Sequence, residues 1–121
     1  MEKTVLVIDD SVTIRLYYRG ILEQAGYTVE QAANGYEGIE KALLHPFALF
    51  IVDINMPIMD GYTFLRKVRD LTDVPAIMIS NESEERDVQR AYEAGASIYI
   101  VKPVEPAELL LHVNMLIGQK S

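Results

Sequence analysis

The sequence has no cysteine, no tryptophan and only two histidines, His45 and His112. The missing cysteine excludes disulfides, iron–sulfur clusters and thiol catalysis, and two distant histidines do not form a typical zinc site. We expect both histidines to lie on the surface. Basic residues are also few, because 11 Lys and Arg stand against 18 Asp and Glu for a net charge of −7. This acidity disfavours direct binding to nucleic acids or anionic membranes, both of which need a basic surface.

Long apolar runs are missing as well. The N-terminus carries only four apolar residues before Asp9, too few for a signal peptide, and no run approaches the length of a membrane span. We therefore expect a cytoplasmic protein. With 121 residues, 50% of them hydrophobic, the chain is long enough to bury an ordinary core as one domain.

Short apolar runs alternate with amphipathic segments along the whole chain. Five runs, rich in β-branched residues, predict strands at 4–8, 28–32, 47–52, 75–79 and 97–101. The second run is the most polar and is typical of an edge strand. Runs without internal alternation are typical of strands that are covered on both faces, as in a parallel sheet.

Each run is followed by residues at helical spacing. The expected helices start after Ser11, at Tyr36, at Tyr62, at Ser83 and at Pro106, with Ser11 as an N-cap. The order is therefore βα repeated five times, which predicts right-handed crossovers and a three-layer α/β sandwich. These segments use the whole chain, so we expect one domain over residues 1–121 with no effector domain.

The residues just after the runs are the informative ones, because ligands of open parallel sheets bind beyond the carboxyl ends of the strands. They are Asp9 and Asp10, Asp53, Ser80 and Lys102. Three close carboxylates repel one another and need a cation, and a purely oxygen ligand set selects a hard divalent ion, most naturally Mg²⁺. The lysine and the hydroxyl suit the oxygens of a phosphoryl group. Asp53, which ends the middle run, is the best candidate for a nucleophile that forms an aspartyl-phosphate.

The same positions belong to five short motifs in a fixed order. They are VIDDS at 7–11, VDINMPIMDG at 52–61, SN at 80–81, AGA at 94–96 and YIVKP at 99–103. Each motif alone is common, but together, at the ends of the expected elements, they are specific. In this combination the chain resembles the receiver domain of bacterial two-component response regulators over essentially its full length. The resemblance implies a flavodoxin-like (βα)5 fold with the strand order 2-1-3-4-5.

The resemblance also implies roles for the acidic residues. Asp53 corresponds to the phosphoacceptor, and Asp10, Asp53 and the backbone carbonyl of Asn55 correspond to the direct ligands of Mg²⁺. Asp9 corresponds to the acid that acts on the ion through water.

Three further residues acquire roles in the same way. Lys102 corresponds to the lysine that binds the phosphate, Ser80 to the switch hydroxyl and Tyr99 to the aromatic residue that rotates inward with it. The Lys102–Pro103 peptide bond is expected to be cis.

A function as a stand-alone, phosphorylation-controlled binding switch follows from the resemblance. The phosphoryl donor is expected to be a histidine kinase or a histidine phosphotransfer protein, and the output surface to be the fourth helix, fifth strand and fifth helix. Asn55 and Glu82, each two residues beyond a motif residue, resemble the pair in chemotaxis regulators, which lose phosphate quickly. Chemotaxis is therefore the expected pathway, and a phosphorelay shuttle or a receiver cut from a longer regulator or hybrid kinase is the alternative.

Two other classes of protein use related features. A haloacid-dehalogenase-like phosphatase needs Asp-x-Asp after the first strand, whereas Asp9 and Asp10 are adjacent and Ser11 follows. A flavin carrier needs a hydroxyl- and glycine-rich loop there, and two acids would repel its phosphate. We therefore expect a signalling switch that turns over no external metabolite.

The last helix carries a second apolar stripe. Leu109, Leu110, Val113, Leu116 and Ile117 centre on one side of the helical wheel. Ala107, Leu111 and Met115 lie nearly opposite and are expected to face solvent in a monomer. They are ordinary exposed apolar residues or a surface for a partner or for self-association.

Overall fold

The computed structural model describes residues 3–118. Its five strands are β1 (Thr4–Ile8), β2 (Thr28–Ala32), β3 (Leu49–Asp53), β4 (Ala76–Ser80) and β5 (Ile98–Val101). Its five helices are α1 (Val12–Gln24), α2 (Gly35–Leu44), α3 (Gly61–Val68), α4 (Glu85–Ala94) and α5 (Pro106–Ile117). All strand pairs are parallel, in the order β2-β1-β3-β4-β5, which confirms the expected flavodoxin-like fold.

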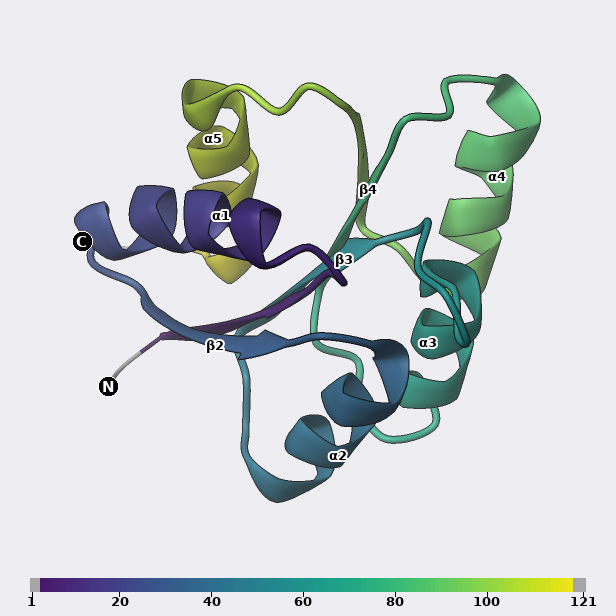
Figure 1. Cartoon of the computed structure of the whole chain (residues 1–121), viewed down its shortest axis with the longest axis horizontal. Coiled ribbons are helices and arrows are strands. Elements are labelled where there is room, and N and C mark those ends of the chain that lie inside the picture. Colours follow the sequence, from purple (N-terminus) through teal and green to yellow (C-terminus); the bar gives the residue numbers. More distant parts are fainter. Residues whose placement is uncertain (1–2, 119–121) are drawn as a thin grey trace.

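Helices cover both faces of this sheet. α1 and α5 lie side by side on one face, and α2, α3 and α4 lie on the other (Figure 1). Each face has its own apolar core, centred on residues such as Leu22 and Leu109 on the first side and Phe64 and Ala91 on the second. Within residues 3–118 no helix is both long and apolar enough to cross a bilayer.

Burial explains why the strands could be recognised. Every residue of β3 and β4 is buried, because these strands lie inside the sheet with helices on both faces. β2 lies at an edge and alternates between exposed and half-buried residues before it ends at the buried Ala32, as its polar sequence predicted. The third strand was predicted two residues too early. Phe47 is buried in the core and the Ala48 N–H donates to the Thr4 carbonyl at 2.8 Å, but the ladder itself runs from Leu49 through Asp53.

The helix starts agree with the sequence at α1 and differ at α4. Ser11 caps α1, since its hydroxyl accepts the Ile14 N–H at 3.2 Å. α4 was predicted to open at Ser83, but it starts at Glu85, its N-cap position is Glu84, and the Glu84 side chain makes no capping bond. The Glu84 carboxylate pairs instead with Arg86 at 2.8 Å. Acidic residues in the first turn provide the favourable charge at this end of the helix.

The histidine predictions are half right. His45 is exposed. His112 was expected on the surface, but it is half-buried and its Nδ1 is shielded from solvent without a hydrogen-bond partner. His112 lies on α5 directly before the buried Val113.

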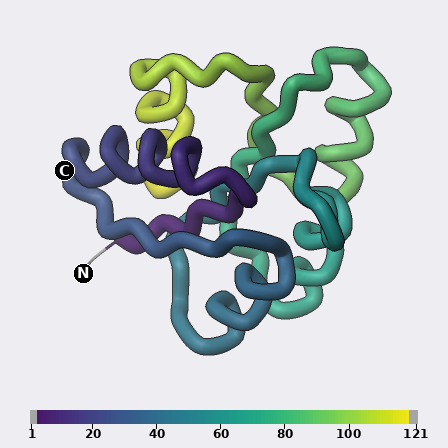
Figure 2. The backbone as a smooth tube through the Cα atoms, in the orientation of Figure 1, coloured from purple at the N-terminus to yellow at the C-terminus, as the bar shows by residue number. Residues whose placement is uncertain are grey.

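Parallel strands bring their carboxyl ends, and the loops that follow them, to one side of the sheet, as can be followed in the trace of Figure 2. At this side of the sheet the backbone of Gly61 lies close to the backbone of Asp53 and Ile54, and this contact fixes the loop after β3. The Gly61 N–H donates to the Ile54 carbonyl at 2.9 Å. A Cβ at Gly61 would lie 2.7 Å from the Asp53 carbonyl oxygen, so only glycine lets α3 begin this close to the end of β3.

Candidate functional site

Three carboxylates meet at the carboxyl ends of β1 and β3. Asp9 and Asp10 follow β1, Asp53 ends β3, and one carboxylate oxygen from each lies within 4.8 Å of the other two. Asp9 and Asp53 are buried, whereas Asp10 is exposed. The sequence therefore predicted correctly that these three acids share one site.

Asp9 is held by its neighbours in the β1–α1 turn. Its Oδ1 accepts the Ser11 N–H at 2.9 Å, and Arg15 donates to its backbone carbonyl at 2.5 Å. The other carboxylate oxygen, Oδ2, is buried without a hydrogen-bond partner. Burial raises the pKa of Asp9 to about 6, with repulsion from Asp53 and Asp10 adding to the rise and the Ser11 hydrogen bond opposing it.

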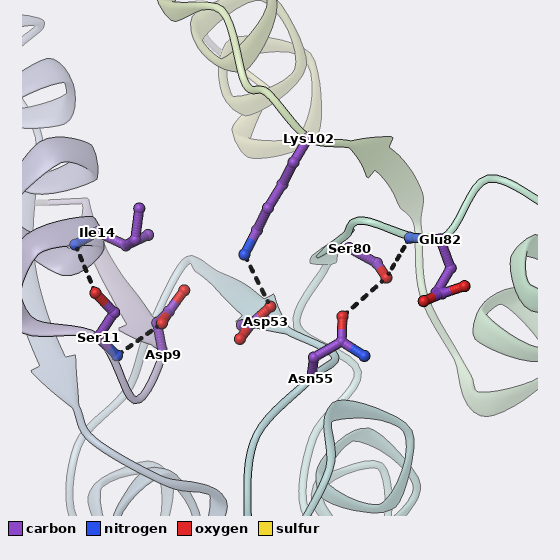
Figure 3. A network of polar contacts seen from close by, with 8 residues as sticks. All are labelled: Asp9, Ser11, Ile14, Asp53, Asn55, Ser80, Glu82 and Lys102. Carbon is purple, nitrogen blue, oxygen red and sulfur yellow. Dashed lines mark hydrogen bonds and ion pairs between the residues drawn. The ribbon is translucent and has the colours of Figure 1, made fainter.

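Asp53 faces a lysine across the site. Lys102 Nζ lies 3.4 Å from Asp53 Oδ1, so the two groups form an ion pair (Figure 3). Burial raises the pKa of Asp53, and the positive charge of Lys102 opposes this rise. The Lys102 N–H donates to the Ser80 carbonyl at 2.8 Å, and the Lys102–Pro103 peptide bond is cis, as expected. The end of β5 thus aims the lysine at the end of β3.

Ser80 ends β4 on the other side of Asp53. Its buried hydroxyl donates to Asn55 Oδ1 at 3.2 Å and accepts the Glu82 N–H at 3.0 Å (Figure 3). The half-buried Tyr99 donates its hydroxyl to the Glu82 carbonyl at 2.7 Å. Burial raises the pKa of Tyr99, and a hydrogen bond with the Ser80 side chain opposes this rise. Ser80 and Tyr99 are thus joined through the backbone of Glu82.

The donor set fits a hard divalent cation. Asp9 Oδ2 is a buried carboxylate oxygen without a hydrogen-bond partner, and Asp53 Oδ1 has only the ion pair with Lys102 to offset the charge of three neighbouring carboxylates. Burying such charge is costly unless further cations or donors compensate it. All nearby ligand atoms are oxygens, which suits Mg²⁺. A lysine and a hydroxyl border the same space, so the site has groups for phosphoryl oxygens as well as for a metal.

The sequence model of the response regulator receiver domain family matches residues 5–114. The chain belongs to this family. Receiver domains are the phosphoryl-accepting switches of two-component systems. They are phosphorylated on an aspartate, bind Mg²⁺ at an acidic pocket and interact with histidine kinases and downstream effectors. The expected family is therefore confirmed, and the acidic cluster is the counterpart of that pocket.

Individual relatives support the same family. The chain is 38% identical over 120 residues to the transcriptional regulatory protein ResD of Bacillus subtilis, covering 99% of this chain and 50% of ResD. It is 34% identical over 117 residues to the transcriptional regulatory protein SrrA of Staphylococcus aureus, covering 97% of this chain and 48% of SrrA. The chain thus spans about half the length of these curated relatives.

Solved receiver domains have the same fold. The chemotaxis protein CheY4 of Vibrio cholerae is 35% identical, with a TM-score of 0.91 over 96% of this chain and 99% of CheY4. A CheY-like receiver domain protein from Methanospirillum hungatei is 34% identical, with a TM-score of 0.93 over 98% of this chain and 95% of that one. Likeness to both chemotaxis and transcription proteins defines the receiver domain but not its pathway.

Two features of the site were not predicted. The first is the hydrogen bond from Ser80 to the Asn55 side chain, since only the backbone of Asn55 had an expected role. The second is an open, mainly apolar hollow of about 560 Å³ beside Lys102, lined by residues of α1 and of the segment after β5, among them Ile14, Tyr17 and Val104. Ile14 and Tyr17 contribute to the helical spacing after Ser11, but that spacing does not indicate a hollow.

Proposed function

We propose that this receiver domain accepts a phosphoryl group on Asp53 and thereby switches the binding of a downstream protein. The observation that carries the proposal is the buried Asp53 carboxylate, which faces Lys102 at 3.4 Å and lies within 4.8 Å of the carboxylates of Asp9 and Asp10. A carboxylate oxygen of Asp53 attacks phosphorus, the bond to the donor's histidine nitrogen breaks, and the imidazole leaves after taking a proton from water. The product is an aspartyl-phosphate.

The metal site of the proposal uses Asp10, Asp53 and the backbone carbonyl of Asn55 as direct ligands, with Asp9 acting through water. When bound, Mg²⁺ offsets the negative charge of the carboxylates and of the phosphoryl oxygens. The raised pKa of Asp9 fits this role, because a nearby cation would favour its ionised form.

Lys102 and Ser80 bind the phosphoryl group in the proposal. The ammonium of Lys102 already points at Asp53, and a phosphoryl group there brings oxygens that accept its protons. The Ser80 hydroxyl reorients to donate to another of these oxygens. Since Ser80 and Tyr99 are joined through Glu82, movement of the hydroxyl is transmitted to the aromatic ring at the end of the fourth and fifth strands.

The donor is a phosphohistidine on a histidine kinase or a phosphotransfer protein. Its histidine must reach Asp53 from the open side of the site, next to the apolar hollow beside Lys102. The first half of α1 also exposes apolar side chains, namely those of Val12, Leu16 and Tyr17. We propose this region as the surface that receives the donor protein, and the cytoplasm, where kinases use ATP, as the place of the reaction.

The output surface of the proposal is the face formed by α4, β5 and α5. Leu111 and Met115 on α5 are 58% and 62% exposed and form, with Ala107, the stripe that the helical wheel predicted to face solvent. A downstream protein, or a second copy of this chain, would cover it. This surface serves equally in a stand-alone receiver and in a longer regulator.

A pair of substitutions that introduce negative charge tests the output surface. Leu111→Glu with Met115→Glu is expected to abolish binding of the target, or dimerisation, while phosphorylation of Asp53 continues. The matched control is Leu43→Glu with Leu44→Glu, which places the same charges on two equally exposed leucines of α2. Unchanged binding and unchanged mass in solution for the Leu111 pair would contradict this part of the proposal.

Chemotaxis is the pathway that we propose first, because Asn55 and Glu82 match the pair of the fast-dephosphorylating chemotaxis regulators. A phosphorelay shuttle or the receiver part of a longer regulator is the second candidate, and the likeness to ResD and SrrA favours it. The lifetime of the phosphorylated state distinguishes the two candidates. Rapid loss of phosphate supports chemotaxis, whereas hydrolysis over many hours contradicts the short-lived phosphorylated state that Asn55 and Glu82 predict. We propose that self-phosphorylation and autodephosphorylation are the only reactions of this chain, with no external metabolite turned over.

A pull-down tests the switch as a whole. Wild-type protein with Mg²⁺ and beryllofluoride, a phosphoryl analogue, is expected to retain a target protein that Asp53→Ala does not retain under the same conditions. Equal capture by both proteins would refute a phosphorylation-controlled switch at Asp53.

A further inference from the structure

The hydroxyl of Ser80 is already engaged in the structure, and its partner is not Asp53. It donates to Asn55 Oδ1 at 3.2 Å, while the Glu82 N–H donates to the same hydroxyl oxygen at 3.0 Å. Figure 3 shows the Asn55 side chain lying between Ser80 and the space around Asp53. Ser80 itself is fully buried, so this hydroxyl has little exchange with bulk water.

We propose that the Asn55 side chain is a latch that holds the Ser80 hydroxyl in its resting orientation and sets the threshold for switching. The proposal rests on the proposed roles of Asp53 and Ser80. A serine hydroxyl has one proton to donate, so it can serve Asn55 or a phosphoryl oxygen, but not both. Phosphorylation must therefore break the bond from Ser80 to Asn55.

The two acceptors differ in strength in the direction that a switch requires. An amide oxygen is a neutral acceptor, whereas a hydrogen bond to a charged phosphoryl oxygen is roughly twice as strong. Asn55 is exposed, so its released oxygen can be hydrated at little cost. The latch is thus strong enough to hold the hydroxyl at rest and weak enough to yield to a phosphoryl group. Asn55 acts here as a positioning residue, separately from the proposed role of its backbone carbonyl.

A double-mutant cycle measures the latch. Dissociation constants for beryllofluoride, at saturating Mg²⁺, are determined for wild type, Asn55→Ala, Ser80→Ala and the double variant. The factor by which Ser80→Ala weakens binding is the benefit of the hydroxyl. With Asn55 removed, the hydroxyl no longer has to leave a partner, so its benefit is expected to be about fivefold larger than in the wild type, the effect of one neutral hydrogen bond. Direct contacts of Asn55 with the analogue cancel within each comparison, because the two proteins compared either both keep Asn55 or both lack it.

Asn55→Asp is the conservative control, because it retains an oxygen that accepts from Ser80. Its added charge weakens beryllofluoride binding in both backgrounds, but the benefit of the hydroxyl is expected to be no larger than in the wild type. A second readout is the χ1 angle of Ser80 in ligand-free protein, from NMR couplings. One rotamer is expected in the wild type and an average of several in Asn55→Ala.

The outcomes separate the latch from the function beneath it. An equal or smaller benefit of the hydroxyl in the Asn55→Ala background, or a single unchanged Ser80 rotamer in that variant, would overturn the latch alone. Absence of Mg²⁺-dependent beryllofluoride binding in the wild type, or equal binding by Asp53→Ala, would overturn the proposed function and the latch with it.

Discussion

Replacing Asp9 by asparagine is expected to stabilise the protein in the absence of divalent ions. Burial, together with Asp53 and Asp10, raises the pKa of Asp9 from 3.8 to about 6. At about 1.36 kcal/mol per pKa unit, the ionised form costs the folded state up to about 3 kcal/mol. An asparagine keeps an oxygen for the Ser11 N–H and has no charge to bury. Because its amide must still be desolvated, we expect a gain of about 1–2 kcal/mol.

The pH dependence follows from the direction of the shift. Between about pH 4 and pH 6 the folded protein holds a proton on Asp9 that the unfolded chain has lost. The free energy of unfolding of the wild type therefore falls as the pH rises through this window and loses no more from Asp9 above it. In Asp9→Asn the free energy of unfolding does not show this fall, because residue 9 no longer titrates. The raised pKa of Asp53 makes the free energy of unfolding fall with rising pH in both proteins.

Urea unfolding in EDTA at pH 7.5 and pH 4 checks the prediction. Asp9→Asn is expected to be more stable than the wild type at pH 7.5, with a higher urea concentration at the midpoint of unfolding, and nearly equal to it at pH 4. Adding Mg²⁺ is expected to stabilise the wild type more than the variant, because the variant lacks one carboxylate of the site. A variant equal to or less stable than the wild type in EDTA at pH 7.5 would refute the reasoning.

Three further substitutions test the surroundings of the site. Gly61→Ala places a Cβ 2.7 Å from a backbone carbonyl oxygen and is expected to cost roughly 1–3 kcal/mol in urea unfolding. Gly20→Ala, whose Cβ meets nothing within 4 Å, is the control and is expected to be neutral or stabilising. Asp60→Ala removes the cap that accepts the Thr63 N–H at 2.8 Å and is expected to cost about 1 kcal/mol, whereas Asp60→Asn loses only a few tenths. Lys102→Met removes the charge that opposes the rise in the pKa of Asp53, so an NMR titration of that carboxyl is expected to give a higher pKa than in the wild type, and an unchanged value would contradict the pairing.

The alternation of elements could be predicted because burial on both faces leaves a clear pattern. β3 and β4 are apolar throughout up to the residue that ends each strand, and those end residues, Asp53 and Ser80, are the polar groups of the site. The parallel order then places them together. The strand order itself was predicted from the resemblance to receiver domains, not from the pattern of residues.

The details that were missed depend on choices between nearby partners. Glu84 pairs with Arg86 and makes no capping bond, and α4 begins at Glu85, two residues after the Ser83 start that the sequence predicted. The Ser80 hydroxyl donates to Asn55, a partner 25 residues away along the chain that only the side-chain geometry identifies. Residue type and spacing predicted which groups meet at the site, but not which hydrogen bonds they form.

Phosphorylation measured by intact-protein mass spectrometry tests the central claim most directly. Wild-type protein, incubated with an acyl phosphate and Mg²⁺, is expected to gain one phosphoryl group, and Asp53→Ala is expected to gain none. EDTA should abolish the reaction of the wild type as well. A phosphoryl group on Asp53→Ala, or undiminished labelling of the wild type in EDTA, would contradict the account.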